Sequence, residues 1–127
     1  MISADLQPEM LEIVRERAAR AGLQERITVH RCEPGRIAVQ ARVDFAVAFY
    51  MVHEVPDSDA FFKEMWELLV PGGCFFVAEP TVHTSESEFE QTLQRSLRAG
   101  FAVLEKPKVL ISRAVVLEKA RPPVVSR

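Results

Sequence analysis

Acidic side chains stand where several short apolar stretches of the sequence stop. Asp5 follows Ile2-Ser3-Ala4, Glu33 follows the next β-branched stretch, and Glu79 follows a third one. Ligands of open α/β sheets bind beyond the carboxyl ends of parallel strands, where a carboxylate can accept both hydroxyl hydrogens of a ribose. A second carboxylate on a neighbouring strand can approach the sugar or the exocyclic amine of the same nucleoside. Asp5 and Glu33 therefore point to nucleoside recognition.

Both carboxylates also have structural interpretations, which stay open at this stage. Asp5 stands shortly before Pro8, where a helix is expected to start, so its charge could stabilise the positive end of the helix dipole. Glu33 is followed by Pro34-Gly35, a pair typical of turns, so its side chain could simply be solvated.

His53 and Glu54 are adjacent in a loop that follows a long apolar run. A histidine there can act as a general base if a substrate proton comes within hydrogen-bonding reach. We predict that His53 and Glu54 serve catalysis, with a solvated or capping role as the alternative. The remaining histidines, His30 and His83, do not complete a metal-ligand spacing, so no metal is predicted.

Composition limits the class of protein. The 127 residues are 48% hydrophobic and 27% charged, which is typical of a single globular domain over 1–127. With 16 basic and 18 acidic residues the net charge is −2, so nucleic acid is not an expected partner. No apolar run approaches the roughly 18 residues that span a membrane. The sequence shows no secretory leader, so we predict a cytoplasmic protein with free thiols at Cys32 and Cys74.

Alternating elements must position these side chains. Apolar residues at helical spacing predict helices over 8–21, 58–70 and 85–99. Strands are predicted over 1–4, 27–30, 43–52, 74–78, 101–105 and 110–119. The alternation predicts an α/β fold with a mostly parallel sheet, and the last two strands form an antiparallel pair. The run over 43–52 is apolar throughout, which is typical of a strand buried on both faces.

Local signals mark the ends of these elements. Asp57 or Ser58 is expected to cap the second helix, and Ser85 with Glu88, or Ser87 with Glu90, has capping-box spacing. Gly22 and Gly100 stand where left-handed helix ends are expected. Residues 36–42 are undecided between a loop and one helical turn. The tail Arg121-Pro122-Pro123 is expected to fray.

An ordered set of short motifs resembles the class I S-adenosylmethionine-dependent methyltransferases. Each motif is common alone, but together they follow the family's order and spacing over essentially the whole chain. They are Ile2–Leu11, Arg26–Val29 with Cys32-Glu33, Val43–Val47, Val52–Val55, Leu69–Gly73 and Ala99–Phe101. The resemblance implies a Rossmann-like fold with a C-terminal antiparallel hairpin, S-adenosylmethionine as cofactor and a small-molecule methyl acceptor.

The resemblance also implies roles for single residues. Asp5 corresponds to the ribose-binding acid, Leu6 to the apolar residue beside the adenine, and Glu33 to the residue facing the adenine amine. Ala48 and Phe49 would lie near the methionine part of the cofactor. The remaining candidates would face the acceptor, with His53 and Glu54 as catalytic residues and Tyr50, Glu79 and His83 as substrate-binding residues.

The sequence departs from the family at its start. The family's first strand, its glycine-rich loop and the following helix are expected before Met1, and no GxGxxG or GxxxxGK[ST] motif occurs in the sequence. That strand is central in the family's sheet, between the strand ending at Asp5 and the strand starting at Val43. Without it two strand edges are open, so the edges could close on each other, another chain could fill the gap, or the sheet could split.

Two functions therefore stay open. The first is S-adenosylmethionine-dependent methyl transfer to a small molecule. The second is a non-catalytic, methyltransferase-like domain that forms a homo-oligomer or pairs with a partner chain through its open strand edges.

Overall fold

The computed structural model describes residues 1–121. Contacts between residues divide the chain into two compact units, Met1–Gln40 and the part from Ala41 onward, and each unit is described by itself. The single domain expected over 1–127 stays a prediction. Pro122 and Pro123, which belong to the tail expected to fray, lie outside the described residues.

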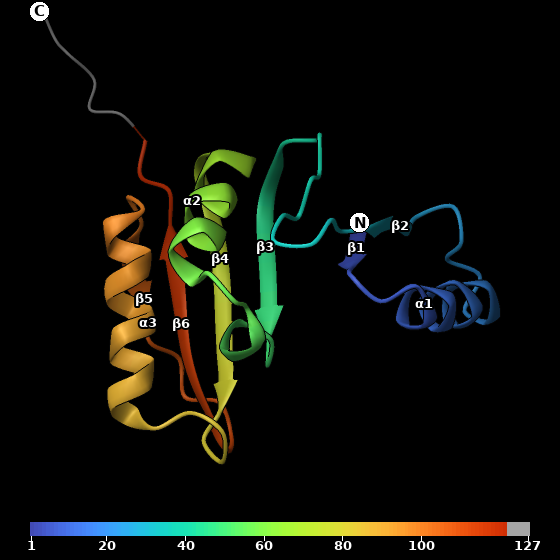
Figure 1. Cartoon of the computed structure of the whole chain (residues 1–127). Helices are drawn as coiled ribbons and strands as arrows, with labels where there is room; N and C mark the ends of the chain where they lie inside the picture. The colour runs from blue at the N-terminus through green and yellow to red at the C-terminus, as the bar shows by residue number, and fades with distance from the viewer. Residues whose placement is uncertain (122–127) are drawn as a thin grey trace, which may run out of the picture. The chain divides into compact units, whose positions relative to one another are not determined.

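The N-terminal unit is a parallel βαβ arrangement (Figure 1). Its elements are β1 (Ile2–Asp5), α1 (Pro8–Arg20) and β2 (Thr28–Arg31). β1 and β2 pair in parallel, with Asp5 opposite Arg31. The end of α1 is a left-handed turn at Gly22, whose φ is 71° and whose N–H donates to the Ala19 carbonyl. Buried Leu11 and Ala18 give the helix the apolar face that its spacing predicts.

The C-terminal unit is a four-stranded sheet with two helices on one face (Figure 1). Its elements in chain order are β3 (Val43–Phe49), the 3₁₀ turn η1 (Val52–Glu54), α2 (Ser58–Leu68), β4 (Leu69–Pro80), α3 (Glu86–Arg98), β5 (Ala102–Glu105) and β6 (Ser112–Glu118). The strand order is β3-β4-β6-β5. β3 and β4 are parallel, whereas β6 pairs antiparallel with both β4 and β5. The predicted antiparallel closing pair is confirmed.

Aromatic side chains fill the space between the helices and this sheet. Phe62 of α2 and Phe75 of β4 are fully buried, and their ring centroids lie 6.1 Å apart. Phe101 joins the cluster at 5.9 Å from Phe75. Such tilted and edge-on ring pairs stabilise a core beyond the area they bury. Two caps fix the helix starts, since Asp57 accepts the Ala60 N–H and Ser85 forms the capping box with Glu88.

The strand over 43–52 differs from its expectation. β3 is parallel to β4, as predicted, but it is the outermost strand of its sheet and is not buried on both faces. Phe45, Val47 and Phe49 are 57%, 59% and 54% exposed. Alternate side chains of a strand point to opposite faces, and these three point away from α2 and α3. The part of the chain that the structure describes contains two sheets, one in each unit, and the three outcomes expected at the open edges stay predictions.

Several boundaries also differ, since β3 ends at Phe49 rather than at 52 and β6 starts at Ser112 rather than at 110. α2 ends at Leu68 and β4 starts at Leu69, five residues before the predicted Cys74, because Leu69 already pairs with Val43. The expected loop after β3 contains the turn η1. Residues 37–42 form neither a helix nor a strand, so the undecided segment is a loop.

Among residues 1–121, none of the helices is both long and apolar enough to cross a membrane.

Candidate functional site

The carboxyl ends of β3 and β4 lie side by side and bring two loop segments together. The Tyr50 N–H donates to the Ala78 carbonyl at 2.8 Å, and the Val52 N–H donates to Oε1 of Glu79 at 2.8 Å. Tyr50 has a φ of 60°, a conformation that is rare for a residue with a Cβ. The chain therefore turns sharply after β3 and places His53 against the end of β4.

Glu79 is the buried centre of this region. Its side chain is 1% exposed, and its second oxygen, Oε2, is hydrogen bonded to Nδ1 of His53. The Thr84 hydroxyl stands 3.5 Å from the same oxygen. When Glu79 is ionised its carboxylate can only accept, and the imidazole hydrogen of a neutral His53 is then on Nδ1. The Nε2 lone pair of a neutral His53 is then available to a substrate.

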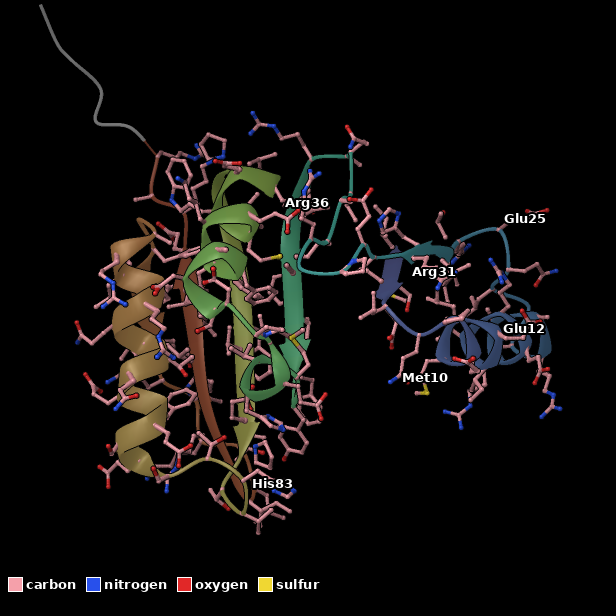
Figure 2. All side chains as sticks on the ribbon, viewed as in Figure 1. Met10, Glu12, Glu25, Arg31, Arg36 and His83 are labelled. Carbon is pink, nitrogen blue, oxygen red and sulfur yellow. The ribbon has the colours of Figure 1, made fainter. Side chains whose placement is uncertain are left out.

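The other groups around His53 are more exposed. Its side chain is 26% exposed, and its Nε2 lies 3.9 Å from a carboxylate oxygen of Glu54, which is 76% exposed. The His83 ring stacks on the His53 ring at a centroid distance of 5.8 Å. Figure 2 shows His83 in the turn just beyond the tip of β4. The structure thus pairs His53 most closely with Glu79, and brings His83 and Glu54 to the same place.

Tyr50 closes the other side of the region. Its hydroxyl is hydrogen bonded to the Ser112 hydroxyl at the start of β6, and its ring stacks on Phe49 at 4.0 Å. Phe49 is 54% exposed, whereas Ala48 is buried. Sequence reasoning missed Ser112 and the buried Thr84. The pairing of β6 with β4 brings Ser112 to this end of the sheet, and the turn after β4 brings the Thr84 hydroxyl to Glu79.

The nucleoside candidates lie in the N-terminal unit, at the carboxyl ends of β1 and β2. Asp5 is partly buried, and one of its oxygens accepts the Gln7 N–H at 2.9 Å. Leu6 is 48% exposed. Glu33 is exposed and stands 3.6 Å from Arg36 across a turn. Each carboxylate thus makes a local contact within the N-terminal unit, and the contact of Asp5 uses one of its two oxygens.

The donor set fits only part of S-adenosylmethionine. The free oxygen of Asp5 and the exposed Glu33 suit a ribose diol and an amine. Close backbone approach to the methionine end needs glycine, and none of the five glycines of the sequence lies between β1 and α1 or between β3 and η1. Among residues 1–121, no group of three or more histidine, cysteine, aspartate and glutamate side chains could hold a metal ion.

Comparison with known structures supports the fold. A methyltransferase from Pyrococcus furiosus shares 19% identity at a TM-score of 0.75, over 94% of this chain and 62% of that one. A SAM-dependent methyltransferase from Aquifex aeolicus shares 20% identity at a TM-score of 0.77, over 91% of this chain and 66% of that one. The [4+2]-cyclase SpnF shares 15% identity at a TM-score of 0.79, over 95% of this chain and 67% of that one. The Rossmann-like methyltransferase fold is confirmed.

The chain spans about two thirds of the length of these structures or slightly less. No curated protein matches it. The model of the methyltransferase domain family matches residues 1–73, which is more than half of the sequence. The chain therefore belongs to the methyltransferase domain family, as its resemblance to the class I S-adenosylmethionine-dependent enzymes implies.

Proposed function

We propose that the chain takes part in S-adenosylmethionine-dependent methyl transfer to a hydroxyl group of a small molecule. The observation that carries this proposal is the buried Glu79 carboxylate, which holds His53 by Nδ1 at the carboxyl end of the sheet. A general base needs a lone pair that is not used by the protein and a fixed orientation, and the hydrogen bond at Nδ1 supports both. Ligands of open α/β sheets bind at the same end.

The residues have distinct roles in the proposed reaction. S-adenosylmethionine, when bound, supplies the sulfonium methyl group. His53 would accept the acceptor's hydroxyl proton at Nε2, and the acceptor oxygen would receive the methyl group that the bound cofactor would supply. Glu79 orients the imidazole, and Glu54, 3.9 Å from Nε2, adds a second negative charge near the resulting imidazolium. Tyr50 and His83 border the acceptor.

The cofactor side of the proposal follows the residue roles that the family resemblance implies. Asp5 and Leu6 would contact the ribose and the adenine, Glu33 would face the adenine amine, and Ala48 and Phe49 would lie toward the methionine part. Much of the rate of methyl transfer comes from positioning the two reactants, so the chain needs few catalytic residues.

The test is transfer of radiolabelled methyl from S-adenosylmethionine to a panel of phenols and alcohols. His53→Gln keeps the size and polarity of the side chain and removes the base, so we expect transfer to fall at least about 100-fold. His30→Gln is the matched control, because His30 lies in β2 and bonds the Ile37 carbonyl. Equal losses in both variants, or none in either, would contradict the proposal.

The second candidate function is non-catalytic association through the open edge of β3. It is favoured by Phe45, Val47 and Phe49, which expose apolar surface beside that edge. An edge strand with a single charge and no proline lacks the usual protection against pairing. We expect the chain to self-associate well above micromolar concentration, and Val47→Lys to reverse this. A monomeric mass by light scattering for the unchanged chain would exclude this function for a second copy.

A further inference from the structure

Three apolar side chains form an exposed rim at the carboxyl end of the C-terminal sheet. Val82, Leu110 and Ile111 are 82%, 87% and 71% exposed. Val82 lies in the turn after β4, and the other two lie in the turn before β6. The two turns are joined, since both the N–H and the hydroxyl of Thr81 donate to the Ile111 carbonyl, at 3.1 and 3.2 Å.

The rim is held in a strained conformation. Ile111 has a φ of 52°, which a β-branched residue adopts only when its surroundings impose it. Ser112 supplies part of that restraint, because its N–H donates to Val109 and its hydroxyl donates to Leu110. Strain of this kind concentrates at functional sites.

The rim is connected to the segment that carries Tyr50 and His53 through two residues next to it in the sequence, His83 and Ser112. Val82 directly precedes His83, whose ring stacks on His53 at 5.8 Å. Ile111 directly precedes Ser112, whose hydroxyl is bonded to Tyr50. A sequence neighbour of each turn therefore contacts the segment that carries Tyr50 and His53.

We propose that this rim binds the apolar body of the methyl acceptor, and that the acceptor is an apolar small molecule with one hydroxyl group. The inference rests on the proposed function for the role of the bound molecule. Three side chains are too few for a stable protein interface, which buries about 1,200–2,000 Å². Glu86 and Glu88 in the first turn of α3, just after the rim, oppose contact with an anionic lipid surface.

The probe is 2-naphthol, followed in amide ¹H–¹⁵N spectra of the full chain without cofactor. We expect shifts at Val82, His83, Leu110 and Ile111. Leu110→Asn should weaken binding about fivefold, because it removes one apolar contact. Ile111→Asn should weaken it as well while the fold is kept, since asparagine tolerates a positive φ.

Leu104→Asn is the matched control, since Leu104 is an exposed leucine in β5 outside the rim. Equal weakening by Leu104→Asn and Leu110→Asn, or shifts confined to other residues, would overturn the proposal. Binding to phosphatidylcholine–phosphatidylglycerol vesicles that Leu110→Asn abolishes would overturn it in favour of a lipid surface. If 2-naphthol binds the rim but no methyl is transferred, only the proposed function fails. If methyl is transferred but the rim binds nothing, only this inference fails.

Discussion

Replacing Glu79 tests how much of the fold depends on the buried carboxylate. Glu79→Ala removes the acceptor of the Val52 N–H, at 2.8 Å, and of the His53 Nδ1–H. Val52 is 3% exposed, so water cannot readily replace the lost oxygen. A buried donor left without a partner costs about 1–3 kcal/mol. The Val52 N–H would lose its partner completely, whereas the His53 side chain is 26% exposed and could reach water. For the two donors together we expect the free energy of unfolding to fall by about 3 kcal/mol.

Glu79→Gln separates shape from charge. The amide oxygen can still accept the Val52 N–H, while the weaker neutral bond to His53 replaces a charge-assisted one. We expect a loss of about 1 kcal/mol for this variant. Glu54→Ala is the matched control on the same loop, and its 76% exposed side chain should contribute within about 0.5 kcal/mol.

The assay is urea unfolding monitored by the fluorescence of Trp66, the single tryptophan of the sequence, which lies in α2 of the same unit. The dependence of the unfolding free energy on urea should be unchanged among the variants. A loss for Glu79→Ala no larger than that for Glu54→Ala would refute the reasoning, because the carboxylate would then not be satisfying buried donors.

Three further predictions concern other parts of the chain. Burial, and then the Arg42 charge, lower the pKa of Lys119 from 10.5. The unfolded chain then binds this proton more tightly, so unfolding free energy should rise as pH increases from the lowered pKa toward 10.5, and Lys119→Met should remove that slope in urea titrations. Ser85→Ala should lower thermal stability by about 1 kcal/mol, because it breaks the capping box with Glu88. Calorimetry should show that the 127 residues bind S-adenosylmethionine only weakly; submicromolar affinity would contradict our assignment of the donor set.

Local signals in the sequence predict most of the secondary structure. Gly22 and Gly100 both take the positive φ expected at a helix end, and Ser85 rather than Ser87 forms the capping box. These features depend on a few neighbouring residues, so spacing alone finds them. The exposure of β3 could not be predicted from the sequence. An apolar run indicates that both faces of a strand can be buried, but it does not show which other elements cover those faces.

The candidate site was predicted as a set of residues but not as a set of contacts. His53, Glu54, Glu79 and His83 follow from the rule that strand ends carry function. Adjacent residues of a loop point in different directions, so the sequence named no partner for His53, and the parallel register of β3 and β4 places Glu79 at Nδ1. Thr84 and Ser112 carry no signal of their own, since a hydroxyl becomes informative only once its partner across 5 or 62 residues is known.

The most direct test of the central claim is the tautomer of His53, read from the ¹⁵N shifts of its two ring nitrogens. The claim is that Glu79 holds the hydrogen on Nδ1 and leaves Nε2 as the base. For the neutral ring we predict a protonated Nδ1 and an unprotonated Nε2. In Glu79→Gln the amide N–H can donate to Nδ1, so the hydrogen should move to Nε2. A hydrogen on Nε2 in the unchanged chain, or the same tautomer in both proteins, would contradict the claim.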